Sequence, residues 1–146
     1  MANFDYLKDF DVKSEESQKY EMGDIRMNDK VPFLMVKPAT EANKPFARAQ
    51  LLRSNKRIKS TGGRGVSLET IEGSRDDDRE LYPRFVITGW GNVFDTSKKE
   101  ITFSVRECEE FLTALPNWIF DGLRSYCTNP QNFSALDESD IAAAGE

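Results

Sequence analysis

The most regular pattern in the sequence is a pair of apolar stripes at three- and four-residue spacing in its C-terminal part, which predicts two amphipathic helices. The first helix is expected to begin at Ser104, because Ser104 and Glu107 have the spacing of a capping box. It ends before Pro116, which cannot continue a helix. The second helix begins near Asn117, expected as its cap, and ends before Pro130. The two stripes consist of Val105, Cys108, Phe111, Leu112 and Leu115, and of Ile119, Phe120, Leu123, Tyr126 and Cys127.

Alternation of apolar and polar residues predicts extended structure before these helices. Val93–Phe94 and Glu100–Phe103 are expected to form a small β-hairpin around a turn at Asp95–Lys98. Gly89–Trp90–Gly91 is expected to be a turn with an aromatic anchor. Val31–Val36 is a short apolar run with a proline near each end, which favours an extended segment at the edge of a sheet.

The middle of the chain is polar, and its helical pattern is weaker. Thr40 is expected to cap a helix from about Glu41 to Ile58. Residues 60–75 begin with a glycine-rich stretch and predict a flexible loop. Asp76–Asp78 are expected to match the N-terminal charge of a short helix that reaches Leu81, an interpretation favoured over a metal site. The apolar face of the first of these helices consists of Phe46, Ala49, Leu52 and Ile58.

Together these elements predict an α+β fold that is mostly α, with short helices, a small β-hairpin and an extended N-terminal arm. A chain of 146 residues has the length of a single domain. We expect an acidic arm over residues 1–30, one mainly helical domain over residues 31–133 and a flexible tail over residues 134–146. The arm contains the aromatic residues Phe4, Tyr6 and Phe10. It is either a loosely ordered tail or a docking segment that orders on a partner.

Charge is distributed unevenly along the chain, whose formal net charge is −5. Seven basic residues and no acidic ones stand between Lys44 and Arg64. This segment is either a solvated helix face balanced by acidic residues of the same chain or a surface for an acidic protein partner. Nucleic acid is less favoured, because the segment has no interleaved aromatic residues and no known nucleic-acid module. The residues expected at a charged contact surface are Arg48, Arg53, Lys56 and Arg57.

The residue types disfavour catalysis. The chain contains no histidine, which removes the most common general base and the most common transition-metal ligand. It has no Cys-x-x-Cys pair, no phosphate-binding loop with a following Lys-Ser/Thr and no Gly-x-Ser-x-Gly motif. Cys108 and Cys127 fall on apolar helix faces and are expected to be core residues. We therefore expect no catalytic residues, no cofactor and no metal site.

Neither a membrane-spanning run nor a signal peptide is recognisable in the sequence. The longest apolar stretches are far shorter than the roughly 18 residues that a membrane helix requires. The expected location is therefore the cytoplasm in which the chain is made.

A set of short, mostly aromatic-rich stretches lies between Val31 and Phe133. They are Val36-Lys37-Pro38-Ala39-Thr40, Asn43-Lys44-Pro45-Phe46, Leu51-Leu52-Arg53, Arg79-Glu80-Leu81-Tyr82, Thr88-Gly89-Trp90, Phe103-Ser104, Leu115-Pro116-Asn117-Trp118-Ile119-Phe120-Asp121, Leu123-Arg124 and Asn129-Pro130-Gln131-Asn132-Phe133. These stretches resemble tail assembly chaperones of long-tailed bacteriophages. The acidic arm and the glycine-rich loop have no counterpart in that family.

This resemblance implies a small, mostly helical protein that coats the tape-measure protein in the bacterial host cytoplasm before tail-tube subunits polymerise. Its implied partners are the tape-measure protein, the tail-tube protein and further copies of itself. A tape-measure protein is a very long helix with apolar stripes, which would aggregate if it were left uncovered. Such a chaperone needs an apolar groove and several copies, but no catalytic centre.

The groove is expected where the aromatic residues of the helical corner gather. A structural virion component, such as a connector or decoration subunit, and a small inhibitory protein-binding module are the alternative functions. For each groove residue the alternative role is that of an ordinary core residue. The six residues expected to line the groove are Trp90, Phe111, Leu115, Trp118, Phe120 and Leu123.

Overall fold

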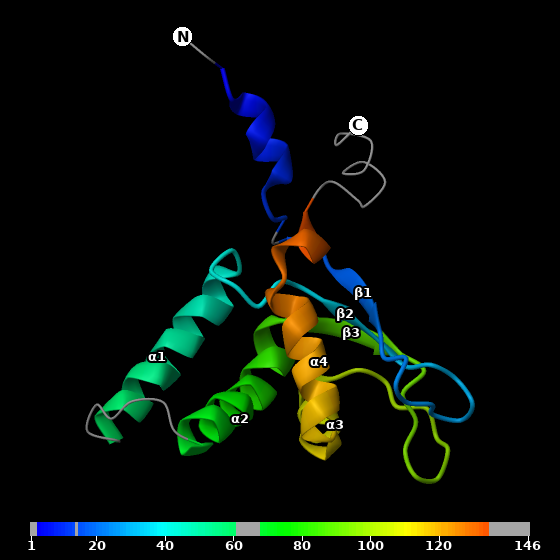
Figure 1. Cartoon of the computed structure of the whole chain (residues 1–146). Helices are drawn as coiled ribbons and strands as arrows, with labels where there is room; N and C mark the ends of the chain where they lie inside the picture. The colour runs from blue at the N-terminus through cyan, green and yellow to red at the C-terminus, as the bar shows by residue number, and fades with distance from the viewer. Residues whose placement is uncertain (1–2, 14, 61–67, 135–146) are drawn as a thin grey trace.

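The computed structural model describes residues 3–13, 15–60 and 68–134. Figure 1 shows helices gathered around a small sheet, with a short helical segment that projects from the body near the N-terminus. The predicted α+β fold, mostly α, is confirmed, although the strands are not the expected ones. In chain order the elements are η1 (Asp5–Phe10), β1 (Gln18–Glu21), β2 (Phe33–Val36), α1 (Lys44–Ser60), α2 (Leu68–Phe85), β3 (Ile87–Gly91), α3 (Val105–Ala114), α4 (Asn117–Thr128) and η2 (Pro130–Phe133).

The sheet has three antiparallel strands in the order β1-β2-β3. The apolar run that contains β2 is extended, as predicted, but its position at an edge was wrong, because β2 is the central strand. Pro32 and Pro38 both lie outside the strand and do not interrupt its hydrogen bonds. Leu34 and Val36 are fully buried and alternate with half-buried residues, so one face of the sheet covers the core.

Part of the predicted N-terminal arm belongs to this sheet. Tyr20 in β1 pairs with Leu34 in β2, and Met22 just after the strand is buried. The connection between the two strands contains a tight turn in which Met27 and Lys30 exchange backbone hydrogen bonds of 2.8 and 3.0 Å. Asn28 and Asp29 at its tip have positive φ angles of 51° and 63°, which asparagine and aspartate tolerate better than most residues.

The expected turn at Gly89–Trp90–Gly91 was wrong, because these residues form the second half of β3. A Cβ atom on Gly91 would overlap the ring of Phe33 on the neighbouring strand, so glycine permits close pairing here. The expected hairpin over residues 93–103 is reduced to a single bridge between Phe94 and Glu100. The segment from Glu100 to Phe103 therefore does not form a strand.

The helical corner is confirmed. The Ser104 hydroxyl accepts a hydrogen bond of 3.1 Å from the backbone N–H of Glu107, and α3 ends before Leu115. Asn117 was wrongly expected to be the cap of α4, because Pro116 occupies the cap position and Asn117 is the first residue of the helix. The local signals of the sequence therefore place both helices correctly, to within one residue at this boundary.

The central part of the chain is more helical than predicted. Asn43, rather than Thr40, caps α1: its Oδ1 accepts a hydrogen bond of 3.4 Å from the Phe46 N–H. The loop expected at residues 60–75 was wrong for residues 68–75, which form the first two turns of α2, while residues 61–67 lie outside the described residues. Asp76–Asp78 consequently lie in the middle of α2 instead of at a helix start.

One hydrophobic cluster joins the sheet to all four α-helices. Tyr82 of α2 is central to it, because its ring makes edge-on contacts with Phe46 of α1 at 5.6 Å and with Phe120 of α4 at 5.7 Å between ring centroids. Along the described stretches of the chain, none of the helices is both long enough and apolar enough to cross a membrane.

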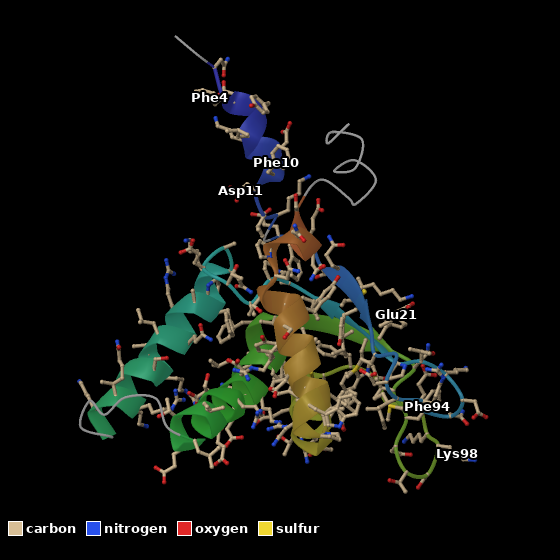
Figure 2. The ribbon with its side chains drawn as sticks, viewed as in Figure 1. Phe4, Phe10, Asp11, Glu21, Phe94 and Lys98 are labelled. Carbon is tan, nitrogen blue, oxygen red and sulfur yellow. The ribbon has the colours of Figure 1, made fainter. Side chains whose placement is uncertain are left out.

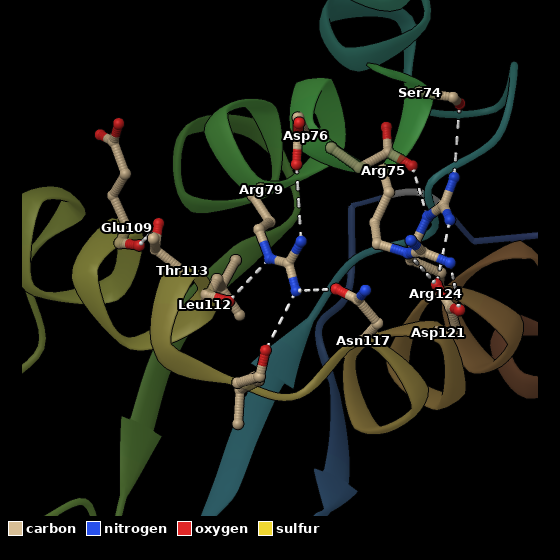
Figure 3. Close-up of polar contacts among 12 residues, drawn as sticks. Ser74, Arg75, Asp76, Arg79, Glu109, Leu112, Thr113, Asn117, Asp121 and Arg124 are labelled. Carbon is tan, nitrogen blue, oxygen red and sulfur yellow. Dashed lines mark hydrogen bonds and ion pairs between the residues drawn. The ribbon is translucent and has the colours of Figure 1, made fainter. Parts of the chain in front are cut away.

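Arg79 of α2 fixes the corner between α3 and α4, as Figure 3 shows. Its guanidinium donates hydrogen bonds to the carbonyl oxygens of Leu112 and Leu115 at 2.9 and 3.0 Å, and to Oδ1 of Asn117 at 2.9 Å. The end of a helix leaves backbone carbonyls without intrahelical partners and carries a partial negative charge. The planar, positively charged guanidinium of Arg79 both donates hydrogen bonds to these carbonyls and balances the partial negative charge at the end of α3.

We expect Arg79→Ala to lower the free energy of unfolding by about 2 kcal/mol, because several hydrogen bonds from a charged donor are lost at once. Arg79→Lys should recover only part of this loss, since an ammonium group cannot match the same set of acceptors. Urea unfolding measures both variants. Arg106→Ala is the control: its side chain is 89% exposed, and the change should cost less than about 0.5 kcal/mol. Equal effects for Arg79→Ala and Arg106→Ala would contradict the assigned role of Arg79.

Candidate partner-binding surface

The six residues expected to line a groove do not form one open surface. Trp90 lies in an aromatic cluster, with ring centroids 5.3 Å from Phe103 and 5.5 Å from Phe111. Its indole N–H donates a hydrogen bond of 2.8 Å to the carbonyl of Ile101. Both Trp90 and Phe111 are half-buried against the hydrophobic cluster.

The other four groove residues are divided between the core and the surface. Leu115, Phe120 and Leu123 belong to the hydrophobic core, with at most 7% of each residue exposed. Trp118, the second residue of α4, is 64% exposed. The apolar stripe of α4 therefore packs inside the molecule, and Trp118 is the only one of the six that is largely open to solvent.

The four predicted charged contact residues fall into two pairs. Arg48 and Lys56 are exposed on α1. Arg53 and Arg57 point toward α2: Arg53 contacts Glu80 at 2.6 Å and Asp77 at 3.8 Å, and Arg57 forms an ion pair with Asp77. For Arg53 and Arg57, the basic charge of α1 is therefore balanced by acidic residues of the same chain.

These ion pairs hold α1 alongside α2, and Figure 1 shows the two helices side by side. Gly73 permits this approach, because a Cβ atom there would lie 2.8 Å from Nε of Arg57. The ion pairs link successive turns of the two helices in opposite order along the chain, so α1 and α2 are antiparallel. The C-terminal half of α1 thus lies next to the middle of α2, from Gly73 to Glu80.

This part of the helix pair carries most of the exposed large apolar residues that lie outside the N-terminal segment. The sequence pattern predicted that Leu52 and Ile58 lie on the apolar, inward face of α1, and this prediction was wrong. Both residues are exposed, because α1 contacts the rest of the molecule mainly through its first turns and through its arginines. The exposed fractions are 61% for Leu51, 71% for Leu52, 57% for Ile58, 70% for Leu68 and 48% for Ile71.

Three of these residues lie toward one side of the helix pair. On α1, the side chain of Gln50 lies near Asp78 of α2, and Leu51 and Ile58, which are seven residues apart, lie on the flank of α1 next to Gln50. On α2, Ile71 lies seven residues, or about two turns, before the same Asp78. Leu68 lies about one turn before Ile71. We call Leu51, Ile58, Leu68 and Ile71 together the α1–α2 face.

Helix α4 covers this same side of the pair farther along α2. Arg124 of α4 contacts Asp78 at 2.8 Å and Asp121 at 3.2 Å, and Arg75 of α2 donates two hydrogen bonds of 3.0 Å to Asp121. Figure 3 shows the interactions of Arg124 with Ser74 and Asp121. Ile71 lies one turn before Ser74 and Arg75, so the α1–α2 face begins where these contacts with α4 end.

The two carboxylates in this network have opposite pKa shifts. Burial raises the pKa of Asp78, and the neighbouring Arg124 opposes that rise. Asp121 is more exposed, and its pKa is lowered, chiefly by the hydrogen bonds from Arg75 and further by Arg124. The network therefore stabilises the ionised form of Asp121 and joins α2 to α4.

The two cysteines of the chain are enclosed. Both cysteine thiols are buried, and burial raises the pKa of Cys108 to about 12 and raises that of Cys127 as well. Across residues 3–13, 15–60 and 68–134, histidine, cysteine and acidic side chains form no group of three that could hold a metal ion.

Comparison with protein-family models identifies the origin of the chain. The model described as YdaY prophage protein matches residues 42–144, more than two thirds of the sequence. The chain belongs to this family of prophage proteins. The family match includes all four α-helices and hence the α1–α2 face, whereas η1, β1 and β2 precede it. No curated protein and no solved structure matches the chain.

We expect Asp121→Asn to lower the free energy of unfolding at pH 7. The difference in this free energy between the variant and the natural chain should shrink as the pH falls below about 4, where carboxyl groups ordinarily become protonated. A lowered pKa means that the ionised form contributes stability above the unfolded-state pKa, and that this contribution is lost as the pH falls through the folded-state pKa. Urea unfolding at several pH values between 7 and 3 provides the measurement.

Glu110→Gln is the matched control, because Glu110 pairs with Arg106 at 3.8 Å between two exposed side chains, and its loss should change stability little. A difference between Asp121→Asn and the natural chain that stays constant from pH 7 to pH 3 would contradict the assigned role of the Arg75–Asp121–Arg124 network.

Proposed function

We infer that this prophage protein is a tail assembly chaperone that binds the tape-measure protein in the host cytoplasm and has no catalytic activity. Membership of a prophage family supports a role for a phage. The stretches that resemble tail assembly chaperones lie largely within the same part of the chain. The observation that carries the proposal is the α1–α2 face, an apolar surface on two helices that are held in place by ion pairs.

The α1–α2 face suits a helical partner. Next to this face, α4 already packs across α2 and against the same side of the helix pair. A helix of the partner would cover Leu51, Ile58 and Ile71 in the corresponding position beyond α4, and the three helices would then enclose an apolar seam. A tape-measure protein, with its long helix and apolar stripes, presents a surface of this kind.

Positive charges border this surface along α1, whereas Glu69 and Glu72 border it along α2. Arg48 precedes Leu51 and Leu52 by one turn, and Lys59 directly follows Ile58. Both side chains belong to exposed residues. They favour a partner helix that carries acidic residues beside its apolar stripe, and they should make association faster at low salt.

The proposed absence of catalysis agrees with the state of the reactive groups. Cys108 and Cys127 remain protonated thiols at neutral pH, because burial raises the pKa of each. A protonated, enclosed thiol is a poor nucleophile. Binding through an exposed surface requires none of these groups.

The test uses a helical fragment of the tape-measure protein from the same phage genome, and isothermal titration calorimetry with the full chain. We expect the double variant Leu51→Ser/Ile71→Ser to bind the fragment at least tenfold more weakly, because two exposed apolar side chains are removed from the contact. Both side chains are exposed, so the variant should keep the unfolding temperature of the natural chain to within a few degrees.

Trp118→Ser is the matched control, since Trp118 is 64% exposed and lies outside the α1–α2 face. It should bind the fragment as the natural chain does. Loss of binding in Trp118→Ser alone would move the contact to the start of α4. Absence of binding by the natural chain would overturn the proposed function itself.

A further inference from the structure

The N-terminal segment η1 presents an apolar stripe to solvent. In a 3₁₀-helix, side chains three residues apart lie directly above one another. Phe4, which caps η1, and Leu7 and Phe10 within it have this spacing and form one row. Their exposed fractions are 62%, 52% and 48%, so within the described part of the chain this row has little cover. Figure 2 shows Phe4 and Phe10 on the projecting segment.

The remaining sides of η1 are mainly acidic. Asp5, Asp9 and Asp11 stand against the single basic residue Lys8. Lys8 contacts Asp5 at 3.7 Å between two exposed side chains, which leaves the segment with net negative charge. The segment is therefore a small amphipathic helix with an apolar row beside carboxylates.

The base of this segment is fixed to the body. Val12 forms a bridge with Ser134, and the Lys13 N–H donates a hydrogen bond of 2.9 Å to the carbonyl of Phe133. In Figure 1, η1 extends from this point away from the body, beyond the C-terminal end of α4. The C-terminal end of α1 and the N-terminal end of α2 lie at the opposite end of the molecule in this view. The segment of one chain is thus directed away from the α1–α2 face of that chain.

The two surfaces are complementary. Along α1, the α1–α2 face is bordered by Arg48 and Lys59, and α1 contains no acidic residue. Along α2, the exposed residues Glu69 and Glu72 stand beside Leu68 and Ile71, so the α1 edge is the one that suits an acidic segment. The segment η1 is apolar along one row and bordered by Asp5 and Asp9. Opposite charges beside matching apolar surfaces fix the orientation of a contact and disfavour the pairing of like surfaces, such as two copies of α1.

We propose that η1 of one copy docks on the α1–α2 face of a second copy. Such a contact joins two different surfaces, so it is heterologous. In a pair of copies, η1 of one copy and the α1–α2 face of the other stay unoccupied. Further copies add in a row or close into a ring. The inference rests on the face used in the proposed function: the η1 of a neighbouring copy covers this face until a tape-measure helix displaces it.

Two variants with complementary defects test the contact without any partner protein. Phe4→Ser/Phe10→Ser removes the apolar row of η1 and keeps the face, whereas Leu51→Ser/Ile71→Ser removes the face and keeps the row. By sedimentation velocity, the natural chain should associate with increasing concentration, and each variant alone should associate at least tenfold more weakly. An equimolar mixture of the two variants should form a one-to-one pair and stop there.

Tyr6→Ser is the matched control for the segment, because Tyr6 is 62% exposed but does not lie in the row of Phe4, Leu7 and Phe10. It should associate as the natural chain does. A natural chain that stays monomeric, a row variant that associates normally, or a mixture that does not pair would each overturn the inference.

Titration with the tape-measure fragment separates this inference from the proposed function. The Phe4→Ser/Phe10→Ser variant keeps an uncovered face and should bind the fragment at least as tightly as the natural chain. Fragment binding by a chain that never self-associates would overturn only the docking of η1. Self-association without fragment binding would overturn only the chaperone function.

Discussion

Arginine side chains that reach between helices are the interaction on which the structure depends. Arg79 joins α2 to the end of α3, and Arg124 of α4 lies between Asp78 and Asp121. Arg53 and Arg57 join α1 to α2 in the same way. Helix α2 takes part in each of the contacts that join two helices, and Tyr82 on the same helix contacts the rings of Phe46 in α1 and Phe120 in α4. Charged contacts at the sides of α2 therefore orient elements that share one hydrophobic core.

This mode of attachment has a direct consequence for the surface. Ion pairs from Arg53 and Arg57 hold α1 against the middle of α2. The C-terminal end of α1 and the N-terminal end of α2 extend past these ion pairs. Leu68 and Ile71 stay exposed where the contacts with α4 end, and Leu51 and Ile58 stay exposed on α1. Exposed apolar surface on a rigid scaffold is a common basis of protein recognition. In the proposed account it receives a tape-measure helix, and the η1 of a second copy covers it beforehand.

The sequence predicted the parts of the fold that local signals determine. The capping box at Ser104 and the break at Pro116 located α3 and the start of α4 almost to the residue. Helix α2 was missed in part because its first turns carry few apolar residues and its contacts are ionic, so they show no apolar periodicity. The strands β1 and β3 were missed because their pairing partners are distant in the sequence.

The candidate surface was harder to predict than the fold. An apolar stripe looks the same in the sequence whether a neighbouring element covers it or not. Phe120 and Leu123 are covered by the core, whereas Leu52 and Ile58 are exposed, and only the tertiary arrangement distinguishes the two cases. The arginine-rich pattern of α1 was visible, but the role of Arg53 and Arg57 depended on finding Asp77 and Glu80 on a helix that runs alongside α1.

The most direct test of the central claim is an NMR titration of the chain, labelled at leucine and isoleucine methyl groups, with the tape-measure fragment. The account predicts that the methyl signals of Leu51, Ile58, Leu68 and Ile71 shift or broaden, because these side chains form the contact. The signals of Ile119 and Leu123, which are buried in the core, should stay in place. Shifts confined to residues around the α3–α4 corner, with the α1–α2 face unchanged, would contradict the account.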